Sequence, residues 1–132
     1  MFASIDISAS ALAAQRVRLN VIANNIANVN SRDKQTGLPY RRQNVVFNVG
    51  SAANPATGVS VKDIVENMSQ FPEKYDPTHP YADKETGIVQ MTNVDPMVEM
   101  VDMIEATRAY EANVTAMEAA KSIVMSTFKI IA

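Results

Sequence analysis

The sequence has no cysteine, no tryptophan and a single histidine among its 132 residues. The absence of cysteine excludes disulfides, thiolate metal sites and cysteine nucleophiles. The histidine, His79, has no partner ligand at the spacing of a zinc or calcium motif. Glycine occurs only at four separated positions, so no glycine-rich loop is available to hold a phosphate. We therefore expect no catalytic residue, no metal, no cofactor and no enzymatic activity.

Acidic and basic residues are nearly balanced in number. The chain has 12 Lys and Arg against 14 Asp and Glu, a net charge of −2 that offers no basic surface for nucleic acid. The longest uncharged run, residues 43–61, is interrupted by glycine and proline, unlike a membrane span, so direct membrane insertion is not expected. Asp6 comes early and the first basic residue is Arg16, so we expect no cleavable signal peptide.

Helix-breaking residues are concentrated in the middle of the chain. Proline is absent from residues 1–38, and all four glycines lie between residues 37 and 87. This distribution predicts an N-terminal helix in 1–30, a β-rich and proline-containing middle segment in 31–94, and a long C-terminal helix in 95–132. The predicted fold class is mainly α, with the two terminal helices pairing as a coiled coil and a small β-rich or extended insert between them.

The N-terminal helix, expected over residues 4–30, has apolar side chains at three- and four-residue intervals. They are Ile5, Leu12, Leu19, Ile22, Ile26 and Val29. This spacing is typical of a seam that packs against another helix. The pattern leaves open whether the partner helix belongs to the same chain or to another.

The C-terminal helix has a clear start, because Asp95 can cap its first N–H groups and Pro96 suits its first position. Its heptad positions are Met103, Thr107, Tyr110, Val114, Met117, Lys121, Val124, Phe128 and Ile131. At ~1.5 Å per residue the helix would be roughly 55 Å long, whereas a compact chain of this size is roughly 36 Å across. We therefore expect a rod.

The middle segment contains two stretches of β-branched residues bounded by glycine or proline. Residues 40–49 and 58–66 are predicted to form short strands. Residues 71–87 contain three prolines, which favour extended backbone before them, and are predicted to form an ordered or extended loop.

Residues 23–30 read "ANNIANVN", an unusual amide content for a helix. On a helical wheel, Asn20, Asn24 and Asn28 form a row opposite the apolar seam, and residues 19–31 carry no charge. Asparagine is a poor helix former, so this helix is expected to need partners. We interpret the row as a second contact surface that fixes register between neighbours. The alternative is a solvated polar face that happens to lack charge.

Acidic residues recur every three positions early in the C-terminal helix, at Glu99, Asp102, Glu105 and, after Arg108, at Glu111. We interpret them as a solvated, partly ion-paired helix face rather than as carboxylates gathered for acid–base work.

Four stretches together resemble one known family. They are "ALAAQRVRLNVIANNIANVNS" (11–31), "YRRQNVVF" (40–47), "YDPTHPYAD" (75–83) and "TNVDPMVEMVDMIEATRAYEANVTAMEAAKSI" (92–123). In order and over nearly the whole chain, they are similar to the bacterial flagellar basal-body rod proteins, specifically the short proximal-rod type. Ile88 and Thr92 depart from the family pattern, where Tyr and Pro are expected, which affects the expected loop geometry.

The resemblance implies a structural protein of the basal-body rod, which crosses the periplasm. It implies export by the flagellar type III apparatus and helical polymerisation into a tube that transmits torque and carries the export channel. The implied partners are copies of the same chain, other flagellar rod proteins, and the basal-body ring and export apparatus. A soluble coiled-coil adaptor or export chaperone, forming a small closed oligomer, is the alternative.

The family motifs map onto the stretches 24–28 and 108–113, which would contact other subunits, with Tyr110 as a candidate aromatic anchor. Together with the seams, the predicted subunit interface comprises Leu19, Ile22, Asn24, Asn25, Ile26, Asn28, Val29, Met103, Arg108, Tyr110, Asn113, Val114, Met117, Val124 and Phe128.

Overall fold

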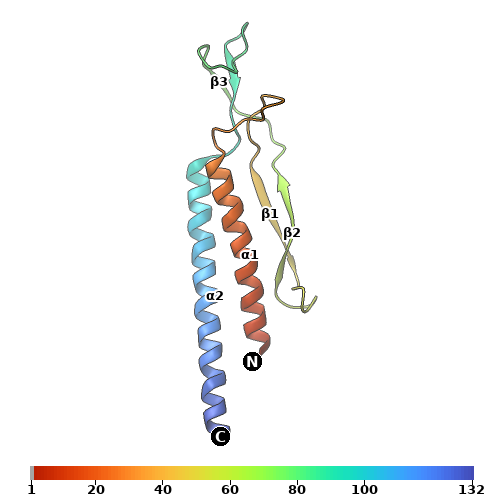
Figure 1. The fold of residues 1–132 in the computed structure, drawn as a ribbon, viewed down its shortest axis with the longest axis vertical. Coiled ribbons are helices and arrows are strands. Elements are labelled where there is room, and N and C mark those ends of the chain that lie inside the picture. The colour runs from red at the N-terminus through yellow and green to blue at the C-terminus, as the bar shows by residue number, and fades with distance from the viewer. Residues whose placement is uncertain (1) are drawn as a thin grey trace.

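The computed structural model describes residues 2–132 as an elongated molecule built on two antiparallel helices (Figure 1). The elements in chain order are α1 (Phe2–Ala27), β1 (Gln43–Val49), β2 (Val59–Glu66), β3 (Glu73–Tyr75), β4 (Ile88–Gln90) and α2 (Pro96–Ile131). Two terminal helices with a small β insert were predicted, and both features are confirmed. Neither described helix is long and apolar enough to cross a membrane.

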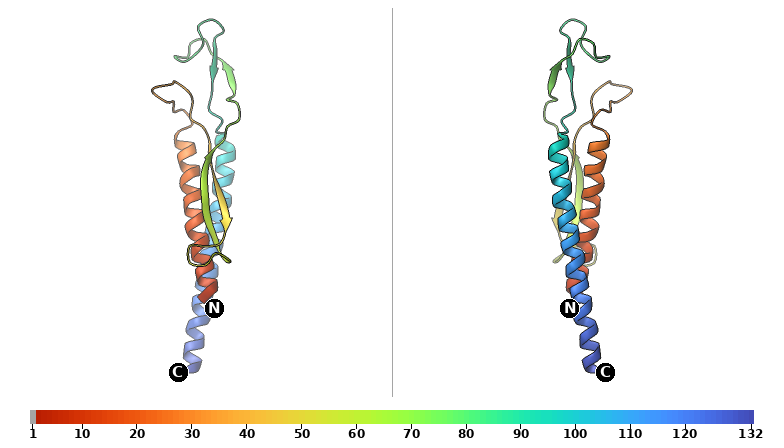
Figure 2. Two further views of the ribbon diagram at one scale, coloured as in Figure 1. Left: turned by 90° about the vertical axis from the view of Figure 1, so that its right-hand side faces the viewer. Right: turned by 90° about the vertical axis from the view of Figure 1, so that its left-hand side faces the viewer.

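Helix α1 occupies the centre of the molecule. It packs along α2 on one side and against the β1–β2 hairpin on the other (Figures 1 and 2). Of its six predicted seam residues, Ile22 is buried and the other five are half-buried. Ala14 and Val21 are buried on the flank of α1 that lies beside the hairpin. Helices α1 and α2 also contact each other directly, for example through the ion pair between Arg18 and Glu105, so the two helices pair within one chain.

The start of α2 is the one predicted from sequence. Asp95 adopts an extended backbone, its side chain accepts a hydrogen bond from the Met97 N–H at 3.0 Å, and Pro96 occupies the first turn. The helix then continues unbroken for 36 residues, which explains why the molecule is a rod rather than a globule.

The face of α2 that meets α1 is rotated relative to the predicted one. Ala106 and Ala120 are buried, whereas Thr107 and Lys121, placed in the seam from the heptad count, are exposed. Small alanine side chains let two helix backbones approach closely, and the predicted row Met103, Tyr110, Met117 and Val124 stays half-buried beside them. A heptad count based on large apolar residues gives no weight to alanine, so it is wrong at these positions.

Helix α1 ends at Ala27, earlier than the predicted residue 30. The side-chain amide of Asn28 donates to the Asn24 carbonyl at 2.8 Å, and the backbone then turns through Asn28 and Ser31. Asparagine side chains compete with the backbone in this way, which ends the helix before the apolar pattern does.

Strands β1 and β2 form an antiparallel hairpin running from the pair Gln43–Glu66 to the pair Val49–Val59, with a bulge after Val46. Both predicted strands are confirmed. The turn end is attached to α1 at Gly58, whose φ is +84° and whose Cβ position would lie 2.6 Å from the Ser10 hydroxyl. That hydroxyl accepts the Val59 N–H at 3.1 Å, so only glycine permits this approach.

Residues 71–87 were predicted as a loop, but the short strand β3 lies within them and β4 follows directly after them. They pair antiparallel, with Tyr75 opposite Ile88, and form the far end of the molecule in Figure 1. Each strand has three residues, too few to show an alternating apolar pattern in the sequence.

Candidate functional site

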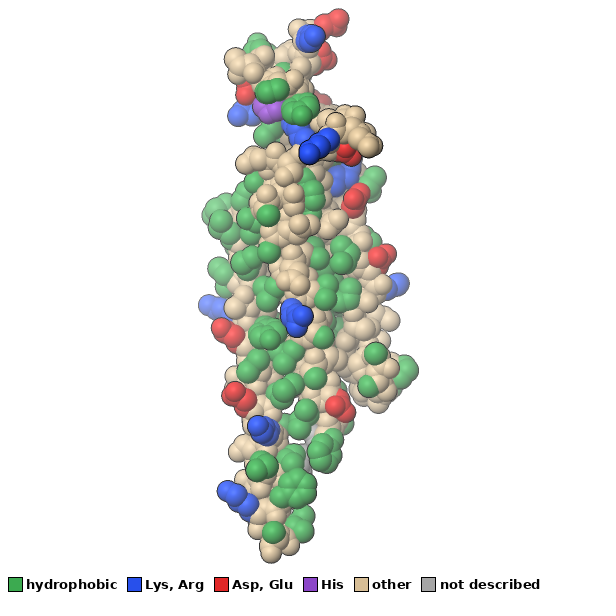
Figure 3. Space-filling model, in the orientation of Figure 1, with side chains coloured by type: hydrophobic (Ala, Val, Ile, Leu, Met, Phe, Trp, Pro, Cys, Tyr) green, Lys and Arg blue, Asp and Glu red, His purple; other side chains and the backbone are tan. Residues whose placement is uncertain are grey.

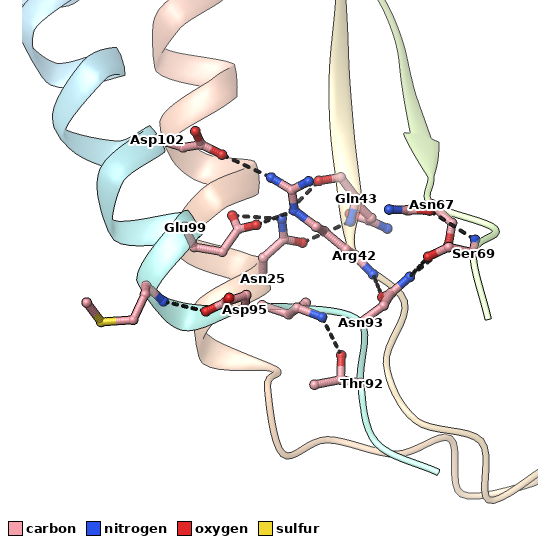
Figure 4. Close-up of polar contacts among 12 residues, drawn as sticks. Asn25, Arg42, Gln43, Asn67, Ser69, Thr92, Asn93, Asp95, Glu99 and Asp102 are labelled. Carbon is pink, nitrogen blue, oxygen red and sulfur yellow. Dashed lines mark hydrogen bonds and ion pairs between the residues drawn. The ribbon is translucent and has the colours of Figure 1, made fainter. Parts of the chain in front are cut away.

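The end of α1, the start of β1 and the start of α2 meet in a cluster of polar side chains, here called the polar junction (Figure 4). It consists of Asn25, Arg42, Gln43, Asn93, Glu99 and Asp102. These residues come from three segments that are distant in sequence. The junction therefore fixes the hairpin relative to the helix pair.

Asn25 is the centre of the polar junction and is only 1% exposed. Its Nδ2 donates to the Gln43 carbonyl at 2.9 Å, and its Oδ1 accepts the Gln43 N–H at 3.0 Å. The same amide also donates to Glu99 at 3.2 Å and accepts the Tyr40 hydroxyl at 2.9 Å. Every polar atom of this buried side chain is thus paired, which is what burial of an amide requires.

Arg42 holds two carboxylates of α2 at once. Its Nε pairs with Glu99, and its Nη2 pairs with Asp102 at 2.9 Å. Glu99 is fully buried, so the interpretation of the acidic row as a solvated face is wrong at this residue. Buried charges persist only when paired and hydrogen-bonded, and the guanidinium fork supplies both.

The loop that leads into α2 is fastened to the hairpin by two side chains. Asn93 Oδ1 accepts the Arg42 N–H at 2.7 Å, and its amide donates to the Asn67 carbonyl at 2.9 Å. The Thr92 hydroxyl donates to the Tyr40 carbonyl at 2.6 Å. Thr92, noted above as a departure from the family pattern, therefore has a hydrogen bond that proline could not make.

Tyr40 connects the polar junction to the asparagine row. Burial raises the pKa of its hydroxyl, a hydrogen bond from Asn24 lowers it, and the carboxylates of Glu66 and Glu99 raise it further. The net shift is upward. The neutral hydroxyl is therefore the form that suits this folded environment.

The asparagine row lies away from the α1–α2 seam. Asn20 and Asn24 are exposed and Asn28 is half-buried. The Asn28 amide donates to Asn24 Oδ1 at 2.9 Å, and the Asn24 amide lies 3.3 Å from the Tyr40 hydroxyl. The row is thus held in place within the chain while Asn20 and Asn24 stay accessible.

The residues predicted as subunit contacts fall into three groups. Ile22 and Asn25 are buried within the chain. The half-buried group is Leu19, Ile26, Asn28, Val29, Met103, Tyr110, Asn113, Val114, Met117 and Val124. Asn24, Arg108 and Phe128 are exposed, and these three are directly available to another subunit.

The last turns of α2 have no partner helix within residues 2–132. The Asn25 amide donates to the Glu99 carboxylate, and Arg18 Nη2 lies 3.6 Å from Glu105 Oε2. These two contacts fix the antiparallel alignment of the helices. Continued along both helices, this alignment places Phe2 opposite roughly residue 122. Residues 123–131, here called the overhang, extend past the N-terminus (Figure 1). Five large apolar side chains of the overhang are 54–85% exposed: Ile123, Met125, Phe128, Ile130 and Ile131. The remaining side of the helix carries Ser122, Ser126 and Lys129.

A second apolar surface lies at the start of α2. Met97, Met100, Val101 and Ile104 are 50–70% exposed and are here called the Met97 patch. Their spacing of three and four residues puts them on one side of the helix, opposite buried Glu99 and Ala106. Figure 3 shows hydrophobic side chains along this outer edge and at the lower end of α2. The spacing is visible in the sequence, where methionines of this kind suit an adaptable packing surface and core filling is the alternative.

Two protein families match parts of the chain. Residues 5–31 match the family described as "Flagella basal body rod protein", and residues 85–129 match "Flagellar basal body rod FlgEFG protein C-terminal". These ranges cover almost all of α1 and α2.

Curated relatives match over almost the whole chain. The flagellar basal-body rod protein FlgC of Bacillus subtilis (strain 168) is 44% identical, over 98% of this chain and 97% of that protein. FlgC of Escherichia coli O6:H1 is 47% identical over 92% and 91%, respectively. FlgC of Borreliella burgdorferi is 40% identical over 99% and 97%.

Proposed function

The chain belongs to the FlgC family of flagellar basal-body rod proteins, and from this membership we propose how it builds the rod. It is a structural component of the basal body that assembles with other rod components, and it is not an enzyme. The proposal is that it polymerises helically as a proximal-rod subunit, with its helix pair forming part of the wall of a tube. That tube would carry the export channel and transmit torque.

The overhang is the observation that carries this proposal. Large apolar side chains gathered on a helix are normally buried, yet Phe128, Ile130 and Ile131 are 58–85% exposed in residues 2–132. Burying one such side chain contributes roughly 1.5–3 kcal/mol. Neighbouring subunits that surround the overhang would supply this free energy, and a contact of that kind need not close on itself.

The helix pair is proposed to be a coiled coil. In α2 the residues with least exposure, Glu99, Ala106 and Ala120, are separated by multiples of seven. Met103, Tyr110, Met117 and Val124 form a second half-buried row with the same spacing. A sustained seven-residue repeat supports supercoiling of the two helices around each other.

The polar junction supports a role in transmitting torque. A twist applied to the helix pair reaches the hairpin through Arg42 and Asn25, whose side chains are paired on both sides. Paired buried polar networks hold a single geometry. Rigid coupling of the helices to the outer insert is what a drive shaft requires of each subunit.

The exposed contact residues suggest where neighbours bind. Asn24, Arg108 and Phe128 are accessible on three parts of the helix pair, so contacts at all three would place the pair between several subunits. These neighbours are proposed to be copies of the chain and other rod proteins, with the ring and export apparatus at the ends of the assembly.

The asparagine row provides the test of this proposal. Changing both Asn24 and Asn28 to Lys should prevent incorporation into the rod and abolish motility while secretion of the chain continues, because two charges would be buried at a contact. Asn30→Lys, at an exposed position just beyond α1, is the matched control and should leave incorporation intact. Normal motility of the double variant would contradict the proposal. A closed oligomer that never enters purified basal bodies would instead favour an adaptor or chaperone.

A further inference from the structure

We propose that residues 72–91, here called the tip, form a hinged unit whose angle to the helix pair is set by Arg32. This inference goes beyond the proposed rod function and does not depend on it. The tip contains β3, β4 and the loop between them, and it projects beyond the paired helix ends (Figures 1 and 2). Neither strand of the tip packs against another helix or strand within residues 2–132.

The tip is ordered by contacts of its own. Its two strands pair antiparallel, and Val89 on β4 is only 1% exposed. The Gly87 N–H donates to the Asp83 carbonyl at 2.8 Å, and the Gly87 carbonyl accepts the Asp76 N–H at 2.9 Å. The Tyr75 ring packs on Gly87, where a Cβ atom would lie 2.9 Å from the ring. Because these contacts lie inside the tip, the tip can turn as one body.

The chain enters and leaves the tip at two adjacent points. On the entry side, Arg41 holds the chain as far as Phe71, since its guanidinium lies 4.2 Å from the centre of that ring. On the exit side, Thr92 is hydrogen-bonded to the segment before β1. The residues just inside the tip share a backbone hydrogen bond of 2.7 Å. The connections 71–72 and 91–92 therefore form one pivot, and hinges of this kind need only a few residues.

Arg32 is the side chain that crosses this pivot. Its Nη1 donates to the Gly37 carbonyl at 3.1 Å within its own loop, and its Nη2 donates to the Gln90 carbonyl in the tip. Its Cζ also lies 4.9 Å from the centre of the Tyr81 ring. A planar guanidinium can make both hydrogen bonds while it lies over an aromatic ring. One side chain thus joins the loop to two parts of the tip.

The Tyr81 ring is held in the position that Arg32 requires. The Tyr81 N–H donates to His79 Nδ1 at 3.1 Å. The ring also lies close to Gly37, where a Cβ atom would be 3.4 Å away and where φ is +71°. A side chain at this position would be strained and would crowd the ring. Glycine therefore lets the loop approach the tip closely enough for Arg32 to bridge them.

Open grooves surround the bridge made by Arg32. A groove of roughly 360 Å³ separates the loop from the tip and is lined in part by Arg32, Tyr81 and Ile88. Another, of roughly 540 Å³, lies beside Arg41 and Gln90. Packed interiors have few voids of this size, so a few side chains, and no shared core, join the tip to the rest of the chain. Loss of one of them should change the motion of the tip strongly.

Distances between paired spin labels test the hinge directly, because the natural chain has no cysteine to replace. One pair of labels joins the tip to α2, at the exposed positions Lys84→Cys and Thr107→Cys. With Arg32 in place, we expect one narrow distance distribution by double electron–electron resonance. Adding Arg32→Ala should roughly double the width of this distribution, because the tip then turns about the pivot.

A second pair of labels, Arg16→Cys with Thr107→Cys, joins the two helices at exposed positions. Its distance distribution should stay narrow after Arg32→Ala. Lys34→Ala is the matched control, because it removes an exposed cation from the same loop, and it should leave both distributions unchanged. An unchanged tip distance in Arg32→Ala, equal broadening in Lys34→Ala, or a broad tip distance with Arg32 in place would each overturn the inference. Broadening of the helix–helix distance by Arg32→Ala would also overturn it, since Arg32 would then hold the whole fold.

The shape of the arginine side chain should matter as well as its charge. Arg32→Lys keeps the charge but cannot donate to both carbonyls while lying over the ring, so its tip distance should be nearly as broad as in Arg32→Ala. Tyr81→Leu removes the ring and leaves the hydrogen bonds of Arg32, so an intermediate width is expected. A distribution in Arg32→Lys as narrow as with arginine would contradict the bridge described here.

Hydrogen exchange distinguishes turning of the tip from its unfolding. The N–H groups of Asp76, Asp83 and Gly87 are paired inside the tip, and their protection should change by less than about threefold in Arg32→Ala. Loss of protection at all three would show that Arg32 keeps the tip folded, and it would overturn the inference. None of these results affects the proposed rod function, which is tested by incorporation into the basal body.

Discussion

The side-chain amide of Asn25 pairs with the backbone of Gln43 through both of its polar atoms, at 2.9 and 3.0 Å. This arrangement copies the pairing between two β-strand residues, although Asn25 belongs to a helix. It joins α1 to the first residue of β1 and satisfies backbone groups that have no strand partner on that side. The hairpin is therefore attached to α1 by hydrogen bonds that only a carboxamide can form.

Replacing Asn25 by alanine should destabilise the chain by about 2–4 kcal/mol, because it leaves two backbone groups without partners and weakens the environment of buried Glu99. The measurement is the urea midpoint of unfolding followed by circular dichroism. Asn30→Ala, an exposed neighbour, should change stability by less than about 0.5 kcal/mol. Equal effects of the two substitutions would show that the Asn25 pairing contributes nothing to stability.

Replacing Arg42 by alanine should lower the free energy of unfolding by about 3–5 kcal/mol, since it leaves the buried carboxylate of Glu99 without a counter-charge. Adding Glu99→Gln to that variant should recover part of the loss, because the amide needs no counter-charge and its oxygen still accepts from Asn25. A double-mutant cycle on urea midpoints should give a coupling of about 0.5–3 kcal/mol. A coupling of zero would mean that Arg42 and Glu99 act independently, contrary to their contact.

Tyr40 makes stability depend on alkaline pH. Burial raises the pKa of its hydroxyl above the usual value of 10.0. The folded state therefore holds this proton more tightly than the unfolded state does. The protonated Tyr40 hydroxyl therefore contributes to the free energy of unfolding in full below about pH 10, and this contribution is lost as pH rises through the folded-state pKa. Urea midpoints from pH 7 to 11 should show the advantage of the natural chain over Tyr40→Phe shrinking above pH 10.

The control for this experiment is Tyr75→Phe, because the Tyr75 side chain is 72% exposed. The difference in urea midpoint between the Tyr75→Phe variant and the natural chain should stay the same across the pH range. A Tyr40→Phe difference that also stays constant up to pH 11 would contradict the role given to burial of the Tyr40 hydroxyl.

Features set by local chemistry could be predicted from the sequence. Asp95 followed by Pro96 predicted the start of α2, and the apolar spacing of α1 predicted residues that are buried or half-buried. The strands β1 and β2 followed from their β-branched residues between turn-forming residues. In each case the signal lies within a few residues, and the tertiary structure does not override it.

Features that depend on which segments meet could not be predicted. The amide of Asn25 looks like its neighbours in "ANNIANVN", and only the approach of β1 distinguishes it as buried. Glu99 has the spacing of a solvated face, and only Arg42, 57 positions away, makes its burial possible. Ala106 and Ala120 form the helix contact through small size, which a count of large apolar residues ignores.

The central claim is that the chain is completed by its neighbours, and hydrogen exchange of the overhang tests it most directly. Amides of residues 123–131 should exchange with little protection in the isolated chain, since this part of α2 extends beyond α1 and its large apolar side chains are exposed. In purified basal bodies the same amides should be protected at least 100-fold, on the order expected when several apolar side chains become buried. Strong protection of these amides already in the isolated chain, with no further change in the rod, would contradict the account.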